Sequence, residues 1–274
     1  MDLGLKVYQL ETVTYFHFSN HLLMELFKSG NPALNQKFFQ KSLQVDQSEV
    51  MTERGTLNKF GLLFLLVLAS SSFTWSAFYQ GTNVFPWIII SAIVGLILAF
   101  VISFRPMWSA YLVPVFGLVE GVFVGGISAY YNFAFAEKAP GLVMQAVGLT
   151  FGVVIAMYLL YRFRIIKATE KFKAIIFTAT AGIALFYVLA MLLSLFGIQM
   201  PLIHESTMMG IGFSLVVVAV AALNLILDFD MIENGVAMGA PKYMEWFGAF
   251  GLLVTIVWLY LEILRLLSKF ASRK

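Results

Sequence analysis

Long apolar runs separated by short polar breaks dominate the chain from residue 59 onward. Each run is close to the ~20 residues that a helix needs to cross a hydrocarbon core ~30 Å thick. Lipid admits only helices and closed barrels, and these runs are continuous rather than alternating, which favours helices. We predict seven transmembrane helices, at 59–79, 84–104, 108–131, 141–162, 174–197, 207–229 and 244–268. The fold class is therefore an all-α polytopic membrane protein.

Residues 1–57 are mostly polar and lack the pattern of a cleavable signal peptide. We expect a polar, partly disordered N-terminal segment there, followed by the transmembrane domain at 58–274. His17 and His21 stand four apart, but without a third ligand their spacing favours ordinary side chains over a metal pair. Met24 opens the more ordinary start MELFKSGNPALN, so residues 1–23 are a candidate extension.

Composition supports the membrane class and excludes several kinds of chemistry. Only 12% of the residues are charged and 60% are hydrophobic, whereas soluble domains carry about 25% charged residues. Cysteine is absent, which excludes disulfides and thiol chemistry. Neither an H-E-x-x-H motif nor the Gly-x-Gly-Asp motif of intramembrane aspartyl proteases occurs. We expect no enzyme activity, no bound cofactor and no nucleic-acid partner.

The distribution of basic residues predicts the orientation. With the N-terminus inside, the inner segments carry thirteen Lys and Arg residues and the outer loops carry only Lys138. The positive-inside rule then favours an inner N-terminus. Seven spans place the C-terminus outside, although the tail is basic, so the last segment either crosses against its charge or does not cross simply.

Three acids lie in apolar runs: Glu120 in the third, Asp228 near the end of the sixth and Glu262 in the seventh. A carboxylate in lipid costs about 2.5 kcal/mol or more, so such residues usually face a bundle interior and mark an ion or proton path. Asn224 shares a helix face with Asp228 and suits a hydrated cluster, whereas Asp230 points to another side, toward water or headgroups. We predict an ion path that involves Glu120, Asn224 and Asp230.

Each of these residues also has a structural interpretation. Gly117, Gly121 and Gly125 recur every four residues, which is typical of tight helix packing. Glu120, beside these glycines, could be a protonated structural acid. Glu262 can pair with Arg265 three residues later.

Two carboxyls brought together in a low-dielectric site share a proton and respond to pH. We therefore predict that Asp228 and Glu262 form a pH sensor and gate that can bind Ca²⁺ transiently, because hard cations prefer oxygen ligands.

The chain resembles the Bax inhibitor family, also called the transmembrane Bax-inhibitor-motif family, in its bacterial YccA-like branch. The resemblance covers about residues 30–274 and rests on PVFGLVEGVFVGGIS, LNLILDFDMIENG and LYLEILRLL. It implies six helices around a central C-terminal seventh and a pH-sensitive Ca²⁺ leak sensed by two aspartates on the sixth and seventh helices. The matching positions are Asp228 and Glu262, and Glu120 matches the acid of the third-helix pattern.

This sequence departs from the family pattern in two ways. Glu replaces Asp at Glu262, and the separation of 34 residues from Asp228 is about ten longer than the family pattern. A straight helix from Met244 to Glu262 would rise ~28 Å and separate the two acids in depth. A break near Gly248 to Gly251, or a turn beyond the membrane, would bring them together.

Three functions remain open. The leading hypothesis is a pH-sensitive cation leak, with Ca²⁺ as the ion, in the bacterial cytoplasmic (inner) membrane. The alternative is a non-conducting modulator that binds a membrane protease or a stress-response partner within the lipid bilayer. A proton-coupled transporter is the third.

Overall fold

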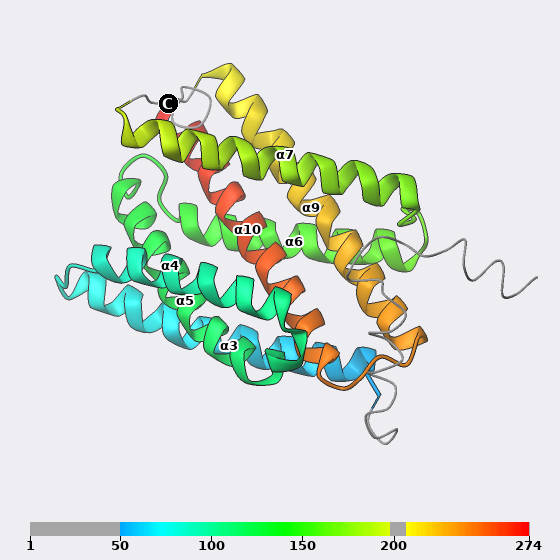
Figure 1. Cartoon of the computed structure of the whole chain (residues 1–274). Coiled ribbons are helices and arrows are strands. Elements are labelled where there is room, and N and C mark those ends of the chain that lie inside the picture. The colour runs from blue at the N-terminus through cyan, green and yellow to red at the C-terminus, as the bar shows by residue number, and fades with distance from the viewer. Residues whose placement is uncertain (1–49, 198–206, 274) are drawn as a thin grey trace, which may run out of the picture. The chain divides into compact units, whose positions relative to one another are not determined.

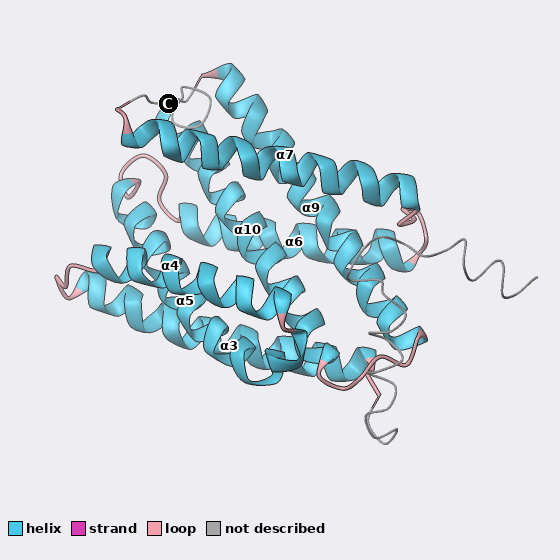
Figure 2. Ribbon diagram, viewed as in Figure 1, coloured by secondary structure: helices cyan, strands magenta, loops and turns pink. Residues whose placement is uncertain are grey.

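The computed structural model describes residues 50–197 and 207–273. Within them the chain forms helices and loops, with one isolated bridge between Val50 and Pro241 (Figure 2). The helices are α3 (Glu53–Tyr79), α4 (Phe85–Phe104), the short 3₁₀ helix η2 (Pro106–Trp108), α5 (Ser109–Ala134), α6 (Leu142–Arg162), α7 (Glu170–Leu195), α9 (Met208–Ala237) and α10 (Met244–Arg273). Seven helical segments are long and apolar enough to cross a membrane. The predicted all-α polytopic fold is confirmed.

The helical unit begins at Val50, so most of the polar segment expected at 1–57 lies outside the described residues. The same holds for His17, His21 and the candidate extension at 1–23.

Threonine side chains start three of the spans. Thr52, Thr169 and Thr207 have extended backbones, and each accepts a hydrogen bond from the backbone N–H three residues later. Such caps satisfy donors that a helix start leaves unpaired. They also explain why α3 starts at Glu53, six residues before the apolar run at 59–79.

Helix α10 is the central element, as predicted. It packs against α3, α5, α6 and α9, and it runs diagonally across the bundle (orange to red in Figure 1). In its apolar stretch 67% of the residues are buried, against 17% in α3, α4 and α7. The other helices therefore present most of their surface to lipid, and α10 presents little.

Glycines set the closest helix contact, between α3 and α5. A Cβ added at Gly121 would lie 2.5 Å from the Val67 carbonyl oxygen, and one at Gly125 would lie 2.4 Å from the Ser71 carbonyl oxygen. A Cβ added at Gly117 would lie 3.4 Å from the Leu63 side chain of α3. The three glycines thus form the face of α5 on which the α3 backbone rests.

Two basic residues near the C-terminal end of α10, Arg265 and Lys269, are accommodated within the bundle. Arg265 pairs with Glu262, and the Lys269 ammonium donates to the Gly210 carbonyl oxygen and the Ser214 hydroxyl, both at 2.9 Å. Helix α10 is one continuous helix, so the last segment passes through the bundle in spite of its charge.

Candidate functional site

Asp228 lies on α9 and faces the N-terminal third of α10. Its Oδ1 is 3.5 Å from the position that a Cβ on Gly251 would occupy. The Thr255 hydroxyl, one turn further along α10, provides a side-chain hydrogen bond to the carboxyl. The second oxygen, Oδ2, is buried and has no hydrogen-bond partner among the described residues. An acid thus sits in an apolar helix interface with half of its acceptor capacity unused.

Small residues on α10 create the room for this acid. Gly248, Gly251 and Thr255 lie within ~60° of one another around the helix, on the side that faces α9. A Cβ on Gly248 would lie 3.1 Å from the Ile232 side chain. Because α9 and α10 run in opposite directions, Ile232 meets Gly248 and Asp228 meets Gly251 one turn away. The carboxyl can approach the α10 backbone because that backbone carries no side chain at Gly251.

Glu262 belongs to a different cluster. Its carboxyl is 2% exposed and accepts hydrogen bonds from the Arg265 guanidinium at 2.9 and 3.0 Å. The Tyr187 hydroxyl of α7 donates to the same carboxyl at 3.0 Å and accepts from Arg265 at 2.7 Å. Arg265 therefore binds both carboxylate oxygens of Glu262, and the Tyr187 phenol binds one of them.

The structure does not bring Asp228 and Glu262 together, so the predicted carboxyl pair is not formed. Glu262 is eleven residues from Gly251 on the same helix, which corresponds to a rise of ~16 Å. No break occurs near Gly248 to Gly251, because α10 is continuous from Met244 to Arg273. No break in α10 therefore compensates for the 34 residues between Asp228 and Glu262. The two acids lie at different depths and have different partners.

Glu120 lies between α5 and α4. Its Oε2 is 3.4 Å from the position of a Cβ on Gly95, and no hydrogen bond or ion pair involves its side chain within residues 50–197 and 207–273. Gly117, Gly121 and Gly125 of α5 face α3, whereas Glu120 faces α4. It is therefore a second acid in an apolar interface, separate from Asp228.

Asn224 and Asp230 both face α7 rather than α10. The Asn224 amide donates to the Thr180 hydroxyl at 2.8 Å. Asp230 forms an ion pair with Lys173 at 2.9 Å and accepts from the Asn234 amide at 2.8 Å. Asn224 and Asp230 thus share the contact between α9 and α7, whereas Glu120 lies apart from them, between α5 and α4.

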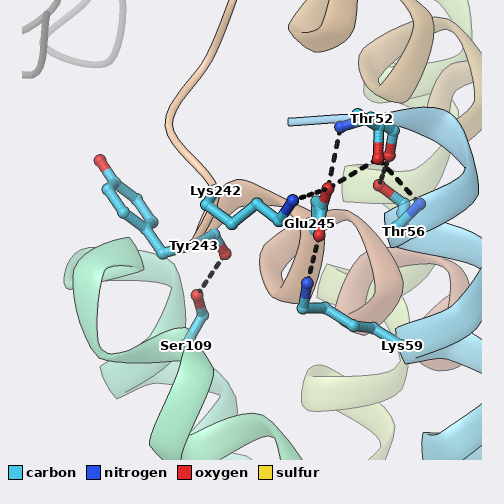
Figure 3. Close-up of polar contacts among 8 residues, drawn as sticks. Thr52, Thr56, Lys59, Ser109, Lys242, Tyr243 and Glu245 are labelled. Carbon is cyan, nitrogen blue, oxygen red and sulfur yellow. Dashed lines mark hydrogen bonds and ion pairs between the residues drawn. The ribbon is translucent and has the colours of Figure 1, made fainter. Parts of the chain in front are cut away.

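Polar contacts gather at the end of the bundle where α3 and α10 begin (Figure 3). Glu245, in the first turn of α10, is completely buried. Its Oε1 accepts from the backbone N–H and the hydroxyl of Thr52, both at 2.9 Å. Its Oε2 pairs with Lys59 of α3, and Lys242 lies 3.6 Å from Oε1. We call Thr52, Lys59, Lys242 and Glu245 the end cluster.

Neighbouring contacts hold the end cluster in place. A Cβ on Gly55 would overlap the Glu245 carboxyl, at 2.1 Å from Oε1. The Ser109 hydroxyl of α5 donates to the Tyr243 carbonyl oxygen at 2.9 Å, and burial raises the pKa of the Tyr243 phenol. Three helix starts and the turn before α10 are therefore joined at one end of the bundle.

Sequence reasoning missed Glu245. The spacing from Lys242 was a local signal, because residues three apart can pair at a helix start. The decisive partners, Thr52 and Lys59, are 193 and 186 residues away in the chain. No periodic pattern connects positions that far apart.

Replacing Glu245 with Gln is expected to lower the free energy of unfolding by about 1–3 kcal/mol, because the buried hydrogen-bond acceptor loses its charge and one of its oxygens. Thermal unfolding of the purified protein in detergent measures this. Lys242→Ala is the matched control, since that side chain is 42% exposed and such pairs contribute about 0–1 kcal/mol. Equal losses in the two variants would contradict the role of the buried Lys59 contact.

No three His, Asp or Glu side chains of the described residues gather closely enough to hold a metal ion. A joint Ca²⁺ site of Asp228 and Glu262 is likewise not formed, since the two carboxyls lie apart.

Comparison with known proteins identifies one family. The family model described as Bax inhibitor 1 like matches residues 31–272. No curated protein and no solved structure matches the chain. The matched range includes every helix described above, apart from the last residue of α10.

Proposed function

Because the chain belongs to the Bax inhibitor 1 like family, we propose that it is a pH-regulated cation leak across a membrane, with Ca²⁺ as the transported ion. The membrane we propose is the bacterial cytoplasmic one, with the N-terminus inside. The single observation that carries the proposal is the buried, half-partnered Asp228 carboxyl between α9 and the central helix.

Asp228 is suited to act as the gate because no cation from residues 50–197 or 207–273 forms an ion pair with it. Its nearest groups on α10 are Gly251 and the Thr255 hydroxyl, and neither is a cation. An unpaired carboxylate is costly in an apolar interface, so the uncharged acid fits the packed arrangement. Loss of the proton favours a wider, hydrated interface, and oxygen-lined sites suit hard cations such as Ca²⁺. Flux should therefore increase as the pH rises.

Glu262 has a different part in this proposal. Its carboxylate is already paired with the Arg265 guanidinium, so it is not an uncompensated acid. We assign gating to Asp228 alone and a structural role to Glu262. Glu120, which has no cation beside it between α4 and α5, is the candidate for a second polar site along the proposed ion path.

Ca²⁺ entry into liposomes that contain the purified protein tests the proposal. We expect entry above that of empty liposomes, proportional to protein density and without saturation at high Ca²⁺. Saturable exchange driven by a proton gradient would indicate a transporter instead. No entry at any pH would contradict the leak and leave the non-conducting class, a modulator of a membrane protease or stress-response partner.

A further inference from the structure

A cavity of about 400 Å³ lies between α3, α5, α6 and α10. Side chains that line it include Leu68, Trp75, Val124, Val147, Ile256 and Tyr260. Asp228 is not among the lining residues, so the cavity is separate from the candidate gate. Its volume lies within the range of about 300–1,000 Å³ that is common for ligand sites.

The chemistry of the wall excludes ions and polar ligands. No charged side chain lines the cavity. Ser128 and Tyr260 hydrogen-bond each other at 2.6 Å, and the Thr150 hydroxyl donates to the Ala146 carbonyl oxygen at 2.7 Å. Ser71 donates to the Leu68 carbonyl oxygen at 3.1 Å. Of the five lining hydroxyls only that of Ser72 has no such bond among the described residues, so an occupant would gain little from polar groups. The wall suits a hydrocarbon chain.

The cavity opens toward lipid between α3 and α6. These helices each pack on α10, and they meet through an edge-to-face contact of Phe64 and Phe151, with ring centroids 5.6 Å apart. Leu68 and Phe151, which also line the cavity, are 44% and 40% exposed on the sides of spanning helices. Side chains exposed there face the acyl chains of the bilayer. The entrance of the cavity is therefore in contact with hydrocarbon chains, the kind of occupant that its wall suits.

The cavity also reaches toward one membrane surface. Trp75 lines it one turn before α3 ends at Tyr79, and aromatic rings near helix ends mark the headgroup level. A lipid could keep its headgroup at that level while one chain turns inward. We propose that this cavity binds one acyl chain of a membrane phospholipid, inserted between α3 and α6. This inference does not depend on ion conduction.

A phospholipid with a diazirine in one acyl chain tests the proposal. After reconstitution of the full chain with this probe, illumination and peptide mapping, we expect labels concentrated on Val143–Phe151 and Leu253–Tyr260. Within the α10 peptide, Leu253, Val257 and Tyr260 are buried and line the cavity, whereas Val254 is 39% exposed and does not, so labels are assigned residue by residue and only those on the first three report the cavity. Labels spread over exposed side chains of all helices, with none on α10, would overturn the inference.

Cavity-filling variants provide the second test. Val147→Phe should reduce labelling of the α10 peptide severalfold, whereas Ile155→Phe on the lipid side of the same helix should not, since Ile155 is 58% exposed and outside the cavity. Unfolding temperatures identify a variant that fails to fold, in which case the wild-type label map decides. Unchanged labelling in folded Val147→Phe would contradict the site. Displacement of the probe by free fatty acid, but not by phospholipid, would contradict the assignment to a phospholipid.

Discussion

Replacing Arg265 with leucine is expected to destabilise the protein by about 3–5 kcal/mol, because it leaves a buried carboxylate without its cation. Glu262 is 2% exposed, and Arg265 contacts both of its oxygens. The Tyr187 hydroxyl would remain as a single neutral donor. Unfolding of the purified protein in detergent, followed by circular dichroism against temperature, measures the loss.

The double variant Glu262→Leu with Arg265→Leu is the matched control. Buried ion pairs replaced by apolar residues of similar volume are often neutral in stability. We therefore expect the double variant to recover most of what Arg265→Leu loses. If the double variant is as unstable as the single one, the ion pair is not the source of the effect, and packing of the Arg265 stem is.

Gly125→Ala is expected to cost about 3 kcal/mol, the upper part of the usual range for overpacking, because it forces α3 away from α5. The added Cβ would lie 2.4 Å from the Ser71 carbonyl oxygen and 2.6 Å from the Ser71 Cα. These atoms belong to the backbone, so no side-chain rotation relieves the overlap and the helices must separate. The yield of monodisperse protein and its unfolding temperature both report this change.

Gly148→Ala is the control for the glycine prediction. It lies within α6, and a Cβ there meets nothing within 4 Å. Alanine favours helix over glycine, so the change should be neutral or slightly stabilising. Equal losses at Gly125 and Gly148 would show that the effect comes from the loss of glycine itself rather than from contact with α3.

The seven spans could be predicted because lipid imposes a length and a polarity on every crossing helix. The ends of the helices were harder to predict from the sequence. Helix α9 continues to Ala237, eight residues past the predicted end of its apolar run at 229, because polar residues extend a helix once it leaves the hydrocarbon. The central place of α10 came from the family resemblance, and the structure confirms it.

The acids were found by sequence, and so was one local partner, Arg265 for Glu262. The partners that come from other helices were not. An acid inside an apolar run, such as Asp228 or Glu262, can be identified from the sequence alone. Which acids meet depends on helix register and on whether α10 bends, and neither is encoded in a local pattern. The uninterrupted helix places Gly251 and Thr255, rather than Glu262, opposite Asp228. The cavity between α3 and α6 also depends on packing and has no signature along the chain.

The most direct test of the proposed gate is the pH profile of Ca²⁺ entry into proteoliposomes, from about pH 5 to about pH 8, a range in which a perturbed carboxyl can titrate. Three proteins are compared: the wild type, Asp228→Asn, and the double variant Glu262→Leu with Arg265→Leu. Our account predicts that entry rises with pH in the wild type and in the double variant. In Asp228→Asn it should stay low and flat, because that side chain cannot ionise. A wild-type profile in Asp228→Asn, or a flat one in the double variant, would contradict the assignment of gating to Asp228.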